Sequence, residues 1–368
     1  GGLNLVDLNG NVRNIAINPA AVEAIDGFAY ANNGGDLVSF DLLTGDLLQT
    51  LTVGFSPIIA MAHEGQKLYT IDASQTLRAF DVSSGTMILR GTLGLPVAAA
   101  KIFVGGGVAY IGAETGFTGG YMTVNVSNSS SLTLISGVDS TSIAGKAIAL
   151  NGSGLAVSVG SLAFIGGAPN FLQLLNAADP AVTDGFVAQF ALAADPFDVA
   201  IASGMAFVAD GTGGLVVVNY KSADNLSVAP TISLTSQAID LDPIAPGIQV
   251  QEGTIFQVIP TVTDDVQVSR VDLLVNGQLV RSDVAFPWDL LVTTPAISAG
   301  GTTLTVRAIA TDTGGNATTS APLTFTVVPD TFAPTIVDTK PTNAAKPFFV
   351  PSIDVRFSEA INQNLLNL

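Results

Sequence analysis

Residues 205–219 read MAFVADGTGGLVVVN, two short apolar stretches separated by a glycine-rich turn. β-Branched and aromatic residues favour strands, whereas Asp and Gly favour tight turns. The segment therefore predicts two neighbouring antiparallel strands. Both halves of the pattern recur in the preceding sequence, so the segment is one copy of an internal repeat.

The second half of the pattern, an apolar stretch followed by Asp or Asn, occurs six times. Its Asp and Asn residues are Asp7, Asp41, Asp81, Asn125, Asn176 and Asn219, at spacings of 34, 40, 44, 51 and 43 residues. The first half precedes the last five copies, at Phe28–Tyr30, Leu68–Thr70, Val108–Tyr110, Leu162–Phe164 and Met205–Phe207. A period near 40–45 residues is typical of propeller blades. We interpret each Asp or Asn as a turn former, because its side chain can bond the turn backbone.

The repeats predict an all-β chain that begins with a β-propeller over residues 1–234. Five full blades and a partial blade are expected, because the first copy lacks the two strands that should precede it; we expect a truncated start. The expected strands of the last blade are Phe197–Ala202, Met205–Ala209, Leu215–Tyr220 and Leu226–Ile232. One blade cannot bury both faces of its sheet, and radial stacking solves this problem.

Residues 205–219 resemble the LVIVP-type propeller repeat. The stretches Phe40-Asp-Leu-Leu-Thr-Gly45 and Phe80-Asp-Val-Ser-Ser-Gly85 are similar to the related quinoprotein-like and YVTN-type repeats. The resemblance covers residues 1–234, and it implies a propeller more specifically than it implies a function.

A second domain is expected after a change of pattern near Leu234. Residues 235–247 read as a linker, and residues 248–330 as a seven-strand sandwich with a hairpin at Asn276-Gly277. Residues 263–277 and 308–316 resemble bacterial Ig-like domains of large surface proteins. Residues 331–368 resemble the start of a further Ig-like domain, truncated, with Phe357-Ser-Glu similar to a stretch of surface-layer repeats. The natural polypeptide is therefore expected to be longer.

Composition excludes several classes of partner and chemistry. The net charge of −17 disfavours nucleic acid and anionic membranes as partners. The absence of cysteine excludes disulfides, thiolate catalysis and Cys-ligated zinc. The uncharged run between Lys146 and Asp179 is long enough to span a bilayer, but its Gly, Asn and Ser residues indicate turns between strands, and no membrane span is predicted.

Candidate catalytic residues are sparse. The only histidine, His63, lies in a Gly-containing stretch and is interpreted as a solvated loop residue. A glycosidase remains an alternative if Glu64 or Glu114 meets an Asp across the central channel. The lone Trp288 is interpreted as a packing residue rather than a ligand platform.

One metal site is predicted from topology. The loops after the second and sixth strands of an Ig-like sandwich lie at the end that receives the incoming linker. Five carboxylates are then expected to converge at the domain junction: Asp240, Asp242, Asp264, Asp265 and Asp312. Calcium favours six to eight oxygen ligands and is the expected ion. In the alternative interpretation, these residues only cap turns.

Together these features favour a non-enzymatic structural or interaction module of a large secreted or cell-surface protein, bacterial or archaeal. Adhesion, surface assembly and an extracellular scaffold are the expected roles. The expected partners are other protein modules or surface polymers, and self-assembly is a further expectation. The alternatives are a glycan- or peptide-binding propeller and, with less support, a propeller hydrolase. No cofactor other than calcium is expected.

Overall fold

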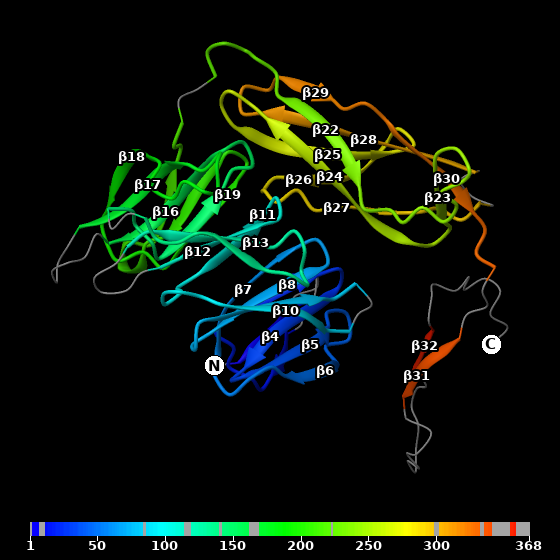
Figure 1. Ribbon diagram of the computed structural model, residues 1–368, viewed down its shortest axis with the longest axis horizontal. Helices are drawn as coiled ribbons and strands as arrows, with labels where there is room; N and C mark the ends of the chain where they lie inside the picture. Colours follow the sequence, from blue (N-terminus) through cyan, green and yellow to red (C-terminus); the bar gives the residue numbers. More distant parts are fainter. Residues whose placement is uncertain are drawn as a thin grey trace.

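The computed structural model describes residues 2–6, 12–83, 86–113, 119–139, 142–161, 169–221, 224–297, 302–331, 335–340 and 354–357. Strands dominate these residues, as predicted, with one short 3-10 helix, η1 (Gly211–Gly213). Figure 1 shows a group of small sheets on one side and a larger sandwich lying across them. In the part of the chain described, no helix combines the length and apolarity needed to cross a membrane.

Four blades are four-stranded antiparallel sheets in sequential order. Blade 1 contains β3 (Val22–Ile25), β4 (Phe28–Asn33), β5 (Asp36–Asp41) and β6 (Leu47–Thr52). Blade 2 contains β7 (Ile58–Glu64), β8 (Lys67–Asp72), β9 (Thr76–Asp81) and β10 (Ile88–Gly94). Blade 3 contains β11 (Ile102–Gly105), β12 (Val108–Gly112), β13 (Tyr121–Asn125) and β14 (Thr133–Ser136). Blade 4 contains β15 (Ala147–Leu150), β16 (Leu155–Ser161), β17 (Asn170–Asn176) and β18 (Phe186–Leu192).

Blade 5 is a three-stranded sheet of β19 (Asp198–Ala202), β20 (Met205–Ala209) and β21 (Leu215–Val218). The chain begins with a hairpin of β1 (Leu3–Val6) and β2 (Val12–Ile15), which is the predicted partial blade. Leu3, Ile15 and Ile17 of this segment pack against Ala29 and Phe40 of blade 1.

The repeated Asp and Asn residues form turns as predicted. In five copies the side-chain oxygen accepts the backbone N–H of the residue two positions later. The pairs are Asp41–Leu43, Asp81–Ser83, Asn125–Ser127, Asn176–Ala178 and Asn219–Lys221. Asp7 of the first copy lies outside the described residues. The repeat is thus a turn signature that ends the third strand of each blade.

The blades are stacked around a common axis. Residues from the first strand of every blade, β3, β7, β11, β15 and β19, line one narrow channel of about 290 Å³. Between blades, apolar side chains of neighbouring sheets form shared clusters; Leu77 of blade 2 and Met122 of blade 3 belong to one of them. Each inner blade therefore buries both faces of its sheet against its neighbours.

The structure corrects the predicted domain boundaries. The strand expected to complete blade 5 at Leu226–Ile232 is absent; instead β22 (Thr231–Ser236) pairs with β24 (Ile255–Thr263) in the second domain. The sandwich thus begins before residue 234, and residues 235–247 join two of its strands rather than linking two domains. Six register pairs from Thr231↔Thr263 to Ser236↔Val258 hold β22, and its alternating side chains suit either sheet.

Blade 4 also differs from the prediction in one strand. The strand that pairs with β17 is β16 (Leu155–Ser161), whereas the predicted position, Leu162–Phe164, lies outside the described residues. The uncharged run after Lys146 contains β15, β16 and β17, so it forms strands as predicted.

The second domain is an Ig-like sandwich of two sheets. One sheet has the order β22-β24-β27, with β27 at Leu290–Thr293. The other has the order β23-β30-β28-β25-β26, and β29 pairs with β28. Its strands are β23 (Ile248–Gln251), β25 (Val268–Val275), β26 (Gln278–Asp283), β28 (Thr303–Asp312), β29 (Ala317–Thr319) and β30 (Leu323–Val328). Asn276 and Gly277 both have positive φ, at 50° and 79°, which makes the predicted hairpin turn between β25 and β26.

The sandwich core is apolar and contains the only tryptophan. Trp288 is 5% exposed and packs with Val258, Leu273, Leu304 and Phe325, among others. It is therefore a packing residue, as predicted. After this domain, β31 (Ile336–Lys340) pairs with β32 (Asp354–Phe357). The rest of the predicted further Ig-like domain, including Ser358 and Glu359, lies outside the described residues.

Burial predicts that two leucines of blade 1 differ strongly in their contribution to stability. Leu37 in β5 has 0% exposure, whereas Leu43 in the following turn has 94%. We expect Leu37→Ala to lower the free energy of unfolding by about 2–5 kcal/mol, because a buried leucine leaves a cavity. Leu43→Ala should change it by less than about 0.5 kcal/mol. Urea denaturation followed by circular dichroism measures both, and equal losses would contradict the blade assignment.

Candidate functional site

The sandwich covers the propeller face that carries the turns between the first and second strands of the blades (Figure 1). The backbone N–H of Gly65, in the β7–β8 turn, donates to Asp289 Oδ1 at 2.9 Å. The N–H of Ser203, in the β19–β20 turn, donates to the Val284 carbonyl at 2.7 Å. The segment between β26 and β27, residues 284–289, therefore meets blades on both sides of the propeller face.

His63 contacts carboxylates of both domains at this junction. Its Nδ1 lies 2.7 Å from Glu23 Oε2 of blade 1, and its Nε2 lies 3.3 Å from Asp289 Oδ2 of the sandwich. Burial acts to lower the pKa of His63, but hydrogen bonds to Asp289 and Glu23 and their negative charge prevail and raise it to about 9. His63 therefore carries a positive charge at neutral pH. The prediction of a solvated loop residue was wrong, because the side chain is 26% exposed and at the end of β7.

Phe286 supplies the apolar part of the junction. Its ring stacks on Phe103 of blade 3, with centroids 6.1 Å apart, and meets Trp288 edge-on at 6.2 Å. A Cβ atom on Gly105 would lie 2.3 Å from this ring, and one on Gly152 would lie 2.8 Å from it. The glycines thus let two blade turns approach the ring closely.

Further contacts tie blade 5 to the same end of the sandwich. Lys221 Nζ donates to the carbonyls of Asp265 and Val266, the latter at 3.2 Å. Asn316 Nδ2 donates to Asp224 Oδ2 at 2.7 Å and to Asp312 Oδ2 at 2.9 Å. The connection between the domains is therefore held at several points.

The five carboxylates of the predicted calcium site do not converge. Asp264, Asp265 and Asp312 do lie at the junction end of the sandwich. Asp240 and Asp242 follow the opposite end of β22, because Thr231, not Ser236, pairs with Thr263 next to Asp264. Asp240 instead accepts the Gln249 N–H at 3.0 Å, and Asp242 the Ile244 N–H at 3.2 Å, which are turn contacts.

The calcium-site prediction failed because it took residues 235–247 as the segment that enters the sandwich, whereas the sandwich already begins at β22. The true incoming segment contains Asp224, which reaches the junction through Asn316. Partial burial, followed by the charges of Asp312 and Asp265, raises the pKa of Asp264, as expected for carboxylates that repel one another. Among the residues that the structure describes, no group of three or more His, Asp or Glu side chains has a metal-binding arrangement.

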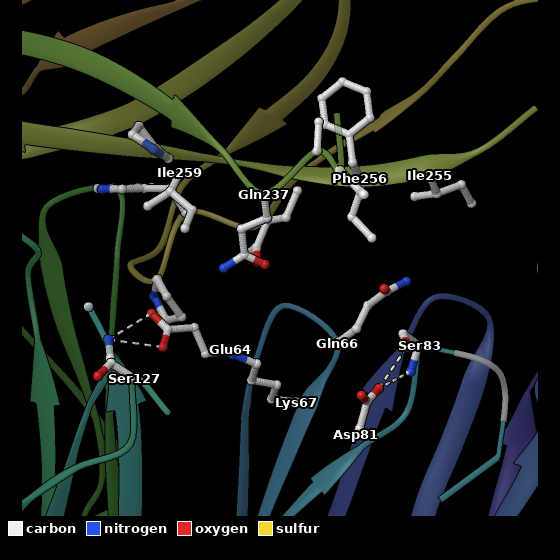
Figure 2. A pocket seen from close by; sticks show the side chains of 18 of the residues that line it. Glu64, Gln66, Lys67, Asp81, Ser83, Ser127, Gln237, Ile255, Phe256 and Ile259 are labelled. Carbon is white, nitrogen blue, oxygen red and sulfur yellow. Dashed lines mark hydrogen bonds between the residues drawn. The ribbon is translucent and has the colours of Figure 1, made fainter. Parts of the chain in front are cut away.

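Between the two domains, beside the junction, lies a cleft of about 890 Å³ (Figure 2). Turns of blades 2 and 3 form its floor, with Glu64, Gln66, Lys67, Asp81, Ser83 and Ser127. The strand β24 and the loop after β22 form its roof, with Gln237, Ile239, Leu241, Ile255 and Ile259. The floor is polar and the roof is largely apolar. Sequence reasoning did not find this cleft, since its walls lie in different domains.

The two carboxylates of the cleft floor already have partners. Both oxygens of Glu64 accept the Gly107 N–H, at 3.3 and 3.0 Å, while burial raises the pKa of Glu64 above its ordinary value. Asp81 Oδ2 accepts from Arg90 at 2.9 Å. Burial acts to raise the pKa of Asp81, yet hydrogen bonds from Ser83 and Arg90 hold it below its ordinary value. Glu114, the other carboxylate predicted for a glycosidase, lies outside the described residues.

Two families match parts of this chain. Residues 98–140 and 195–219 match the LVIVD repeat, and residues 230–306 match a bacterial Ig domain. The repeat matches coincide with blades 3 and 5, and the Ig match begins one residue before β22. The predicted architecture of propeller-type repeats followed by a bacterial Ig domain is confirmed.

Comparison with individual proteins adds no functional information. No curated protein matches the chain. The computationally designed Ika8 protein shares 13% identity over 84% of this chain and 86% of its own, with a TM-score of 0.44. Hydrazine synthase of Kuenenia stuttgartiensis shares 13% identity over 80% and 76%, with a TM-score of 0.42. Fibronectin(III)-like modules of Clostridium thermocellum CbhA share 22% identity over 27% and 98%, with a TM-score of 0.21.

The charge on His63 predicts a pH dependence. In the unfolded chain His63 has a pKa of about 6.5, and in the folded chain about 9. Its stabilising contribution is therefore complete below pH 6.5 and is lost as the pH rises to about 9. We expect the melting temperature, followed by Trp288 fluorescence, to fall across this window. The variant His63→Gln should lack this part of the decrease; equal slopes for both proteins would refute the assignment.

The close approach of Gly105 to Phe286 predicts that substitutions at these two positions have non-additive effects. Gly105→Ala should loosen the junction and shift Trp288 emission to longer wavelength, because its methyl group clashes with the ring. Adding Phe286→Ala should remove most of the extra cost of the methyl group. Gly94→Ala is the matched control, since nothing lies within 4 Å of its Cβ position. Additive effects of the two substitutions would contradict the contact.

Proposed function

We propose that this chain is a non-enzymatic structural and interaction module of a bacterial cell-surface protein, in which the propeller and the Ig-like domain act as one rigid pair. Propeller-type repeats and a bacterial Ig domain fit a surface or structural module. Its proposed role is adhesion or scaffolding outside the cell.

The junction is the observation that carries the proposal. A positively charged histidine lies between carboxylates from two domains, and removing the histidine would leave two partly buried carboxylates without their shared partner. The Phe286 ring and the backbone bonds at Gly65 and Ser203 add shape and direction. A fixed angle between modules suits a protein that holds a binding surface at a defined position. A flexible tether would not need these contacts.

The state of the acidic residues supports a non-enzymatic role. Retaining and inverting glycosidases need two carboxyl groups at the scissile bond, one as general acid and the other as nucleophile or as general base on water. Glu64 and Asp81 in the cleft are engaged with backbone and arginine donors, and Asp289 is paired with His63. These residues are better placed to hold turns and domains than to attack a glycosidic bond.

Labelling of intact cells tests the location. An antibody raised against the purified chain should stain intact cells of the producing bacterium, and protease added outside should remove the signal. A cytoplasmic enzyme of the same cells should stay intact in the same experiment. Staining that appears only after lysis would overturn the proposal.

A further inference from the structure

Blade 5 buries only one face of its sheet. Val199 and Val208 face blade 4 and belong to a cluster shared with it. The opposite face carries Ala200 of β19, Phe207 of β20 and Val217 of β21, which are direct cross-strand partners. These three side chains belong to no apolar cluster in the part of the chain described, and Val217 is 48% exposed. The sheet therefore ends in an apolar face without a covering sheet.

The repeat shows how unusual this face is. Leu215 lies four residues before Asn219, the repeated Asp or Asn of blade 5, and is 69% exposed. The equivalent side chains of blades 1 to 4 are exposed by at most 1%: Leu37, Leu77, Tyr121 and Leu172. All five are large and apolar, so residue type does not explain the difference. The surroundings of Leu215 do.

The same comparison shows what covers this position elsewhere. Leu37 of blade 1 shares a cluster with Ile58 of β7 and Leu68 of β8, the first two strands of blade 2. The clusters that contain the equivalent residues of blades 2, 3 and 4 also include side chains from the first two strands of the following blade. The repeat therefore specifies the cover that Leu215 lacks, namely the first and second strands of a following blade.

The ring of blades is open next to this face. First strands pack side by side in the order β3, β7, β11, β15 and β19. No comparable packing returns from β19 to β3 within the described ranges. The hairpin of β1 and β2 packs on the face of blade 1 that is turned away from blade 2. We call the space between blade 5 and this hairpin the ring opening.

The hairpin provides the other half of a sixth blade. β1 carries the apolar stretch before the repeated Asp7, which is the third strand in blades 1 to 5, so β1 and β2 hold the third and fourth strand positions. In the described part of the chain β1 pairs with β2 alone. On the face away from blade 1, the direct partners Val6 and Val12 are 64% and 63% exposed. The first two strand positions of this blade are therefore the ones that need an occupant.

The described strands of this chain are engaged elsewhere. The strands β3 to β30 belong to the five blades or to the sandwich. The remaining two, β31 and β32, pair with each other, and Figure 1 shows them on the far side of the molecule from β19. The two strands for the ring opening must then come from outside this set.

We propose that the ring opening binds a β-hairpin of this repeat type from another polypeptide. One strand of the hairpin pairs with the edge of β1, and its apolar side chains cover Phe207 and Leu215. Backbone pairing with an exposed sheet edge is an established mode of protein recognition, in which alternate side chains give specificity. This inference rests on the proposed interaction role and deepens it, because it names the kind of partner and its place.

A hairpin copied from blade 2 tests the binding. A synthetic peptide with the sequence of residues 57–73 is suitable, because this hairpin covers Leu37 in blade 1. Two added terminal cysteines close it with a disulfide, since an isolated hairpin is marginally stable in water. In fluorescence polarisation the labelled peptide should bind the purified chain saturably. The variant Leu215→Asp should weaken binding by about tenfold or more.

Matched controls separate the ring opening from other surfaces. Leu43, in a turn of blade 1, is 94% exposed, and Leu43→Asp should bind within about twofold of the unmodified chain. Leu215→Asp should keep the circular dichroism spectrum of the unmodified chain, because its side chain is mostly exposed. A scrambled cyclic peptide should not bind. Absence of binding by the blade 2 hairpin, or equal binding by both variants, would overturn the proposal.

Cross-linking in the producing bacterium tests the source of the hairpin. The photoreactive residue p-benzoylphenylalanine replaces Val217, or Leu43 as the control, and intact cells are irradiated. Mass spectrometry should identify a peptide of a different polypeptide joined at position 217 and not at position 43. A cross-link to the protein's own polypeptide or to a second copy, or no cross-link, would overturn the proposal. Surface staining of the same cells would still stand, so the proposed location is tested separately.

Discussion

A blade of this propeller has two apolar faces, and it can bury both only between two other blades. Buried side chains from neighbouring sheets form shared clusters, as with Leu77 and Met122 between blades 2 and 3. Stacking around an axis meets this requirement, because it places every inner sheet between two neighbours. The channel lined by the five first strands, and the turns at its two ends, follow from that arrangement.

The turns at one end of the propeller create the surface on which the sandwich sits. Glycines in these turns bring the backbone close to Phe286, and His63 at the end of β7 reaches both Glu23 and Asp289. Apolar stacking and a charged histidine between two carboxylates thus act at the same junction. The cleft follows from this geometry, because part of the sheet β22-β24-β27 faces the blade turns across open space.

The strand β22 shows how the two domains share one stretch of chain. Its sequence alternates apolar and polar residues, which suits the outer position of a blade and equally the edge of a sandwich. The structure places it beside β24, and blade 5 has three strands among the described residues. This choice also decides which acidic residues lie near the junction, so Asp224 is there and Asp240 is not.

The sequence alone determined the features that depend on local patterns. The Asp and Asn turns, the hairpin at Asn276, the blade strands around Phe80 and the packing role of Trp288 all follow from neighbouring residues, whose preferences are short-range. Tertiary structure decided the sheet to which β22 belongs, the charge on His63 and the existence of the cleft. These features depend on residues far apart in the chain: Glu23 and Asp289 are brought to His63, and β24 is brought over Lys67, only when the two domains pack. A strand with alternating apolar and polar side chains can join many sheets, and the packing of the complete fold decides which sheet it joins.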